Sequence, residues 1–398
     1  MTSKTFDFSD FLAEGLPPSL VPQPVVRPTY DFAVGYPDPE SFPADGLHEA
    51  LGRALKDHGR DLVLYPHRQG LPELRKFVAE KLQRERGMRV EPDQVVLTSG
   101  SGPAIAMYTQ LFTNPGDTIV TDYFTYLGAL AIMRGFGTNI VGVPTDEEGM
   151  RADALDQTIQ DLQRQGKRPK FIYTIPSFQN PLGTDMKVER RQGILAVAQK
   201  HGIPIYEDDA YEDLRFEGDR YPAIHSYDDS DMVLYSGTFS KIVAPGMRMG
   251  YMVAPQDLVP RITGMHWGTP PSQFSALAIL YYLRDNMENH VAELCDVYRS
   301  RRDTMLGSIG EFMGTSAEVT RPSGGMYIWV RLPEGVNAAV LADKSREKGA
   351  AYLPGPSFSP RGDGQNCFRL CFGYENHQGI RDGIAMIAEV FQEGGLLK

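Results

Sequence analysis

The chain of 398 residues has only three cysteines and no long apolar run. The cysteine count and spacing fit no zinc framework. Cys367 and Cys371 fall in one predicted strand, where they would lie roughly 13 Å apart, too far for a disulfide. The eight histidines contain no HxxxH pair, so we expect no metal site. The most apolar run, SALAILYYL, is too short to span a bilayer.

The sequence also has no secretory signal pattern and no excess of basic residues. Its first segment, MTSKTFDFSDFLAEG, mixes acids with aromatics. The net charge of −11 argues against a nucleic-acid partner. Apolar residues make up 41% of the chain and charged residues 23%, as in soluble globular proteins. We therefore expect a cytoplasmic protein with no membrane or nucleic-acid partner.

Strand and helix patterns alternate through most of the chain. A proline-rich segment near the N-terminus has little periodicity and is predicted to form an extended arm. We expect strands at 94–99, 118–122, 139–145, 170–176, 204–210, 231–240 and 248–255, and helices at 45–57, 71–87, 102–112, 126–137, 152–166, 188–202 and 272–313. This alternation predicts an α/β fold with a mostly parallel sheet covered by helices. The strands at 324–333 and 366–374, with helices around them, indicate a smaller α+β domain.

A glycine turn follows the first predicted strand of the sheet. Gly100-x-Gly102-x-x-Ile105 is nearly a dinucleotide-binding fingerprint, but the bulky Ile105 stands where Gly or Ala is needed. A strand that runs through a glycine turn into a helix start is more generally an anion site. We expect the backbone N–H groups of Ser101 and Gly102 to face a phosphate, with Pro103 in the first helical turn.

Polar residues follow the later strands, at the sheet edge where ligands bind in parallel sheets. They include a lysine, Lys241, that stands among small and apolar residues in SGTFSKIVAPGMRMGYM. A lysine in such surroundings tends to have a lowered pKa, and its neutral amine is a nucleophile. The other members of the set are Asn180, Asp208, Tyr211, Ser236, Thr238, Ser240 and Arg248.

The motifs together resemble the class I/II aminotransferase family of fold-type I pyridoxal-phosphate (PLP) enzymes, closest to its aminoadipate/aromatic (kynurenine-type) subgroup. The resemblance covers residues from about 30 to 395 and rests on VGYPDPESFP, TSGSGPA, FTYLGAL, PSFQNPLG, YEDDAY, SGTFSKIVAPGMRMGY, GGMYIWVRLP and CFRLCFG. It implies a PLP-dependent aminotransferase that exchanges an amino group between an L-amino acid and a 2-oxo acid. It also implies three parts: an N-terminal arm (1–45) that joins the small domain, a large PLP-binding domain (46–290) and a C-terminal small domain (291–398).

The resemblance also implies a role for each matching residue. Lys241 would form the Schiff base with PLP and move the Cα proton. Asp208 would hold the ring nitrogen protonated, while Tyr211 and Asn180 bond the ring oxygen and Tyr126 stacks on the ring. Arg369 would clamp the substrate α-carboxylate, with room left by Gly35. The phosphate would be held by Ser101, Gly102, Ser240 and Arg248, with help from Ser236 or Thr238. Tyr65 would reach the phosphate of a neighbouring subunit, which implies a homodimer.

Some positions depart from the family pattern and leave the substrate open. Gly102 replaces the usual Gln, Leu182 the usual Thr, Phe124 the usual Pro, and the tyrosine motif continues as YPHRQG. The early arm has no arginine from Phe11 to Gln23, and Arg27 is the one candidate for binding a side-chain carboxylate. We therefore expect neutral donors, aromatic or aliphatic.

Three alternatives to transamination remain open at this point. The first is another PLP reaction on the same scaffold, by a lyase, decarboxylase, racemase or oxidase. The second is a dinucleotide-dependent oxidoreductase built on the Gly100 turn. The third is a non-enzymatic regulator that keeps PLP as an effector.

Overall fold

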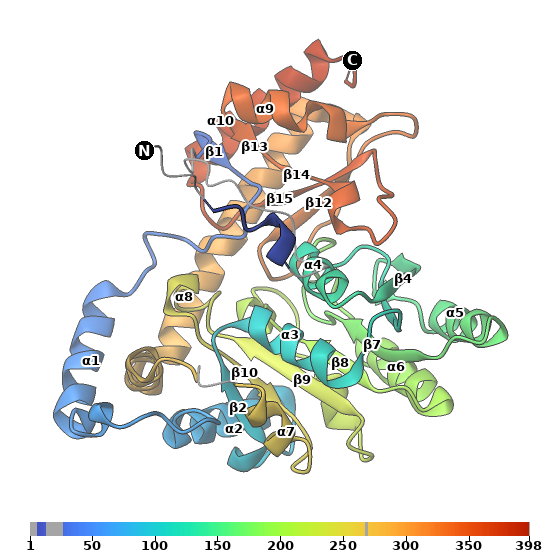
Figure 1. The fold of residues 1–398 in the computed structure, drawn as a ribbon. Coiled ribbons are helices and arrows are strands. Elements are labelled where there is room, and N and C mark those ends of the chain that lie inside the picture. Colours follow the sequence, from blue (N-terminus) through green and yellow to red (C-terminus); the bar gives the residue numbers. More distant parts are fainter. Residues whose placement is uncertain (1–5, 13–26, 267–269, 398) are drawn as a thin grey trace, which may run out of the picture.

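The structure is a computed structural model that describes residues 6–12, 27–266 and 270–397. Figure 1 shows a large sheet with helices around it in the lower half of the molecule, and a smaller set of strands and helices above it. The predicted arm lies partly outside the described residues, because 13–26 are not among them.

The large sheet has seven strands in the order β2-β10-β9-β8-β7-β3-β4. All of them run in one direction except β10, which is antiparallel to both of its neighbours. Most of the strands are buried on both faces, which explains their nearly continuous apolar sequences. The bounds are β2 Val95–Thr98, β3 Thr118–Asp122, β4 Asn139–Val143, β7 Pro169–Thr174, β8 Ile205–Asp208, β9 Val233–Thr238 and β10 Gly250–Val253. The α/β fold class with a mostly parallel sheet is thus confirmed.

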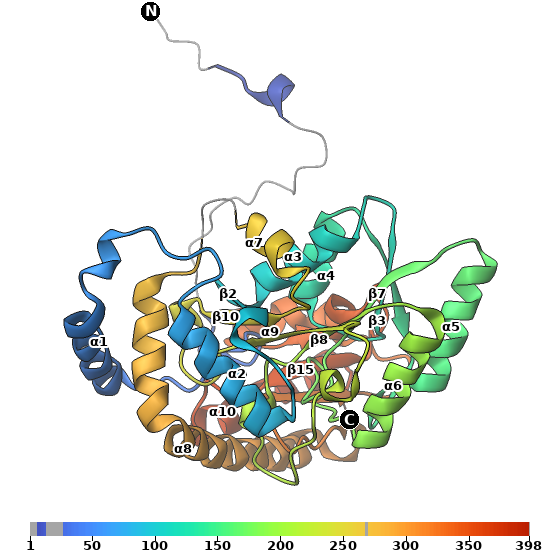
Figure 2. The ribbon, with the colours of Figure 1, turned by 90° about the horizontal axis from the view of Figure 1, so that it is seen from below.

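The helices of this half follow the predicted ranges closely, except for the short helix at 259–264, which was not predicted. The helix predicted over 71–87 begins with Pro72 in its first turn and is capped by Gly87, whose φ of 66° is in the left-handed region. Figures 1 and 2 show helices on both sides of the sheet. Their bounds are α1 Ala44–His58, α2 Pro72–Arg86, α3 Ser101–Phe112, α4 Leu127–Gly135, α5 Ala152–Arg164, α6 Val188–His201 and α7 Val259–Gly264, and a short hairpin pairs β5 Thr145–Asp146 with β6 Gly149–Met150.

One long helix, α8 (Gln273–Met313), connects the two halves of the molecule (Figure 1). Its 41 residues correspond to about 60 Å of helix. It begins where the Ser272 side chain accepts a hydrogen bond from the Ser275 N–H, and it packs against α1 and α10. The domain boundary expected at 290/291 falls inside this helix, and that division stays a prediction.

The upper half contains a four-stranded antiparallel sheet in the order β11-β12-β15-β14. Its neighbour is a two-stranded parallel pair in which β1 (Tyr30–Asp31), from the arm, joins β13 (Ala350–Ala351). The arm and the C-terminal segment are therefore parts of one substructure. The other bounds are β11 Glu318–Val319, β12 Tyr327–Arg331, β14 Leu353–Pro354, β15 Cys367–Cys371, α9 Ala342–Lys348 and α10 His377–Glu393.

This architecture places the polar strand ends together. Because β3, β7, β8 and β9 run parallel, their carboxyl ends meet at one edge of the large sheet. Among the helices that the structure describes, none is long and apolar enough to cross a membrane.

Candidate active site

A cavity of about 520 Å³ lies at the carboxyl ends of β8 and β9, between residues of the large sheet and residues of the upper half. The predicted site residues line it, except Ser236, Arg27 and Tyr65, the last of which was expected to reach a neighbouring subunit. These lining residues are Gly35, Ser101, Gly102, Tyr126, Asn180, Asp208, Tyr211, Thr238, Ser240, Lys241, Arg248 and Arg369. Motifs that are far apart in the sequence thus meet at one cavity.

One end of the cavity is suited to an anion. Helix α3 begins at Ser101, so the free N–H groups of its first turn lie at the cavity. Gly100 precedes it with a φ of 97°, and a Cβ at Gly100 would lie 2.6 Å from Nη2 of Arg248. The same Nη2 donates to the Ser99 carbonyl at 2.8 Å. The guanidinium is therefore held against the helix start because residue 100 has no side chain.

Lys241 follows β9 and lines the same cavity. Its Nζ donates a hydrogen bond to the Gly35 carbonyl at 2.7 Å. Burial lowers the pKa of Lys241 to about 8, and the nearby charges of Arg369 and Arg248 also lower it. The neutral amine is thus far more populated near pH 8 than in an ordinary lysine. This agrees with the expectation from its apolar sequence setting.

Asp208 ends β8 and is almost fully buried. Its Oδ2 accepts a hydrogen bond from the Tyr173 hydroxyl at 2.7 Å, and its Oδ1 accepts one from the Ser236 hydroxyl at 3.3 Å. Burial raises the pKa of Asp208 to about 6, while these two donors oppose the rise. At neutral pH the carboxylate is therefore ionised in spite of its burial.

The next residue, Asp209, is directed into different surroundings. Its Oδ2 forms an ion pair with Arg86 at 2.8 Å and accepts a hydrogen bond from the Tyr235 hydroxyl at 2.8 Å. Asp209 does not line the cavity. Asp208 thus lines the cavity, while Asp209 forms a buried ion pair with Arg86. This is expected for neighbours whose side chains point to opposite faces of a strand.

A chain of hydrogen bonds crosses the cavity from the upper half to the end of β8. Arg369, on β15, donates from Nη1 to Oδ1 of Asn180 at 2.9 Å and from Nη2 to the Ala33 carbonyl. Asn180 donates to the Tyr211 hydroxyl at 3.3 Å. Nε of Arg369 is buried and has no hydrogen-bond partner among the described residues. The guanidinium therefore has one donor that no described residue uses.

Two tyrosines of the site were not singled out from the sequence. Tyr327, on β12, lies 3.2 Å from the Tyr211 hydroxyl, and the Arg369 guanidinium lies over its ring at 4.3 Å. A Cβ at Gly35 would collide with the Tyr327 hydroxyl. Tyr173 is the donor to Asp208. Both tyrosines stand in apolar strands, where nothing in the sequence separates them from core residues.

Three residues considered from the sequence lie away from the cavity wall. Tyr65 is fully exposed in this chain. Ser236 faces Asp208, its partner across β8 and β9, so the suggestion that it helps to hold a phosphate is not supported. Arg27 stacks on the rings of Tyr36 at 5.0 Å and Tyr374 at 5.8 Å, and it donates to the Tyr374 hydroxyl at 3.2 Å.

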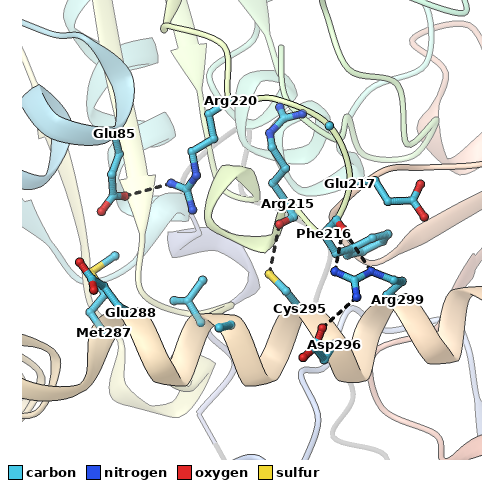
Figure 3. Close-up of a pocket in the computed structure, with 13 residues that line it drawn as sticks. Glu85, Arg215, Phe216, Glu217, Arg220, Met287, Glu288, Cys295, Asp296 and Arg299 are labelled. Carbon is cyan, nitrogen blue, oxygen red and sulfur yellow. Dashed lines mark hydrogen bonds and ion pairs between the residues drawn. The ribbon is translucent and has the colours of Figure 1, made fainter.

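A second cavity, of about 480 Å³, lies between α8 and the segment from Arg215 to Arg220 (Figure 3). Several of its charged side chains have partners: Arg220 pairs with Glu85 at 3.3 Å, and Arg299 donates to the Phe216 carbonyl at 2.8 Å. Burial raises the pKa of the Cys295 thiol in its wall to about 11. No predicted site residue lines this cavity, so the first cavity is the candidate active site.

Comparisons with known proteins agree with one another. The family model for aminotransferase class I and II matches residues 33–381. An aromatic-amino-acid aminotransferase of Thermococcus litoralis is 35% identical over 91% of this chain and 87% of its own. A 2-aminoadipate transaminase of Thermus thermophilus is 32% identical over 92% of this chain and 90% of its own. The crystal structure of a multiple substrate aminotransferase from Thermococcus profundus aligns with a TM-score of 0.89 at 31% identity, covering 98% of this chain and 99% of that one.

The cavity fits the cofactor of this family. It offers a helix start and an arginine for a phosphate, an amine of lowered pKa for an aldehyde, and a buried carboxylate for a ring nitrogen. Arg369 adds a guanidinium to the same cavity. The alternative of a dinucleotide-dependent oxidoreductase is wrong, because the family model and the relatives are those of aminotransferases. The chain belongs to the aminotransferase class I and II family and is a pyridoxal-phosphate-dependent aminotransferase.

Proposed function

We propose that Lys241 is the residue that binds the cofactor covalently and later moves the proton of the substrate Cα. Bound pyridoxal phosphate supplies an aldehyde that takes up the amino group and a ring that accepts electrons from Cα. The lowered pKa of Lys241 supports this role, because only the neutral amine can attack an aldehyde or accept a proton. The hydrogen bond to the Gly35 carbonyl places the Nζ at the cavity.

The remaining residues of the cavity would contact the cofactor at two places, its phosphate and its ring. Ser101, Gly102, Ser240 and Arg248 would hold the phosphate, with Thr238 behind them: the Ser240 N–H donates to Thr238 Oγ1 at 3.1 Å and shapes this turn. At the other end, Asp208 would pair with the ring nitrogen, and Asn180 and Tyr211 would bond the ring oxygen. Tyr126, which is partly buried at the start of α4, would stack on the ring.

Arg369 would bind the α-carboxylate of the amino acid and of the 2-oxo acid. It approaches the cavity from the upper half, it is almost fully buried, and a planar guanidinium matches a carboxylate in a two-bond geometry. The bare backbone at Gly35 leaves room beside it, because any side chain there would meet Tyr327.

The rest of the wall favours neutral substrate side chains, aromatic or aliphatic. Ala33, Val34, Tyr36, Leu127 and Leu353 line it and carry no charge. Arg27 already contacts Tyr36 and Tyr374 and is not part of the wall. One relative is named as an aromatic-amino-acid aminotransferase, which is consistent with aromatic donors. Another is named as a 2-aminoadipate transaminase, so a dicarboxylic donor should be tested beside the neutral ones.

We also propose that the enzyme is a homodimer in which Tyr65 reaches the phosphate of the neighbouring site. Tyr65 and its neighbours Val63 and Leu64 are exposed, an arrangement that a second subunit would cover. The cytoplasmic location expected from the sequence stays a prediction.

The observation that carries the function is the convergence of Lys241, Asp208 and Arg369 in one cavity. Its test is a half-reaction without air and without oxo acid. The enzyme mixed with an amino acid alone should release one 2-oxo acid per site, with the cofactor recovered as pyridoxamine phosphate. Product that accumulates over many turnovers would instead indicate a lyase, decarboxylase or racemase.

A further inference from the structure

The two aspartates at the end of β8 each accept a hydrogen bond from a tyrosine on a neighbouring strand. Tyr173, on β7, donates to Asp208 at 2.7 Å. Tyr235, on β9, donates to Asp209 at 2.8 Å. Both tyrosines are fully buried and belong to the same sheet. Only the first of these pairs has its carboxylate in the wall of the cavity.

We propose that Tyr173 is a positioning residue that keeps the Asp208 carboxylate ionised and fixed at the cavity wall, so that the ring nitrogen of the cofactor stays protonated. The inference rests on the proposed role of Asp208. No sequence motif and no named relative assigns this function to Tyr173.

The physical argument begins with burial. A carboxylate that is nearly withdrawn from water needs donors to remain charged, and Asp208 has two among the described side chains: Tyr173 at 2.7 Å and Ser236 at 3.3 Å. Both bonds go to the ionised carboxylate, and the shorter one, from Tyr173, is the stronger. Tyr173 itself keeps its proton, because burial and the adjacent carboxylate raise its pKa well above the usual value. It therefore donates throughout the working pH range.

The same bond decides where the shared proton resides when a pyridine ring pairs with Asp208. In a buried pair, the proton can sit on the nitrogen, giving an ion pair, or on the carboxylate, giving a neutral pair. A donor to the carboxylate stabilises its anion and so favours the protonated nitrogen. The other ionisable groups around Asp208 are Asp209 beside it, Tyr206 on β8 and Tyr126 at the cavity. Among the described residues, none of these three donates a hydrogen bond to Asp208.

The test uses the holoenzyme reconstituted with pyridoxal phosphate labelled with ¹⁵N in the ring, whose NMR shift reports nitrogen protonation directly. In the parent enzyme the shift should be that of a protonated nitrogen. Tyr173→Phe removes only the hydroxyl, and it should move the shift toward the unprotonated value by changing the proton equilibrium about 10- to 100-fold. Tyr235→Phe is the matched control and should leave the shift in place.

Two further variants keep the test decisive. A fluorinated tyrosine at position 173 is a stronger donor and should hold the nitrogen protonated to higher pH than tyrosine does, even if Tyr173→Phe folds poorly. Asp208→Asn should abolish the protonated signal. A Tyr173→Phe shift equal to that of the parent, or an equal change in Tyr235→Phe, would overturn the proposal. An unchanged shift in Asp208→Asn would overturn the role of Asp208 itself, so the two failures can be told apart.

Discussion

Arg369 and Asn180 are joined by a hydrogen bond of 2.9 Å, although they are 189 positions apart in the chain. One comes from β15 of the upper half and the other follows β7 of the large sheet. The proposed substrate clamp and a proposed cofactor ligand therefore hold each other in place. A change at either residue should affect both substrate binding and the cofactor environment.

Replacement of Arg369 should impair both half-reactions. Arg369→Ala should lower kcat/KM for the amino acid and for the 2-oxo acid by about 100- to 1,000-fold, because a pair of charge-assisted hydrogen bonds contributes on the order of 3–4 kcal/mol. Arg369→Lys keeps the charge but not the planar fork, and should recover only part of the loss. Single-turnover rates of each half-reaction measure this. A loss confined to one half would contradict a shared clamp.

Lys241 should be the only lysine that carries the cofactor covalently. Borohydride reduction and peptide mapping of the parent should place the pyridoxyl group on Lys241. Lys241→Ala should retain non-covalent cofactor through the phosphate contacts yet lose at least 1,000-fold in turnover, since both nucleophile and base are gone. A label on another lysine would refute the assignment.

The capture of cofactor should depend on pH through the same residue. The pKa of Lys241 is lowered to about 8, so its reactive neutral form increases as pH rises through 8. The rate at which the cofactor-free enzyme takes up pyridoxal phosphate should therefore rise between pH 7 and 9 and then level off. Stopped-flow absorbance measures this rate. A rise delayed to pH 10 or above would mean that the lysine has its ordinary pKa.

Asp208 and Asp209 should differ in activity and in stability. Asp208→Asn should lower turnover far more than it lowers cofactor binding, while Asp209→Asn should mainly destabilise the fold by removing the carboxylate nearest to the buried Arg86. Activity assays and urea unfolding compare the two variants. If both variants lost the same turnover and kept the same stability, Asp208 and Asp209 would not lie on opposite faces of the strand.

The sign of the stability change at Asp208 follows from linkage. Its folded-state pKa of about 6 lies above the ordinary 3.8, so the folded chain binds more protons than the unfolded chain between those pH values. The contribution of Asp208 to stability is thus lost as pH rises through 6. At pH 7 the cofactor-free Asp208→Asn variant should be more stable than the parent by up to about 3 kcal/mol, and the gain should vanish near pH 4.

Gly35 should be restricted by Tyr327. Gly35→Ala places a methyl group against the Tyr327 hydroxyl and should lower kcat/KM by about 5- to 100-fold, since overpacking costs about 1–3 kcal/mol. The double variant Gly35→Ala/Tyr327→Phe removes the colliding oxygen and should recover part of this loss. No recovery would indicate that the glycine is required for backbone conformation alone.

Much of the site could be predicted from the sequence, because polar residues interrupt apolar strands at their carboxyl ends. Lys241, Asp208 and Asn180 are of this kind, and Gly87 marked a helix end. Tyr173 and Tyr327 could not be predicted, since a tyrosine in a buried strand looks like core packing until its partner across the sheet is known. The place of Ser236 could not be predicted for a related reason: its hydroxyl donates to Asp208, its partner across β8 and β9, and it does not line the cavity.

Asp208 and Asp209 point to opposite faces of the strand end, so the number of residues in β8 decides which of them lines the cavity. One residue inserted into or deleted from β8 before Asp208 would exchange the two faces of the strand end. Asp209 would then be presented to the cavity, and Arg86 would face the wrong carboxylate. The number of residues from Ile205 to Tyr211 should therefore tolerate change far less than the length of a surface loop, because it decides which of the two carboxylates lines the cavity.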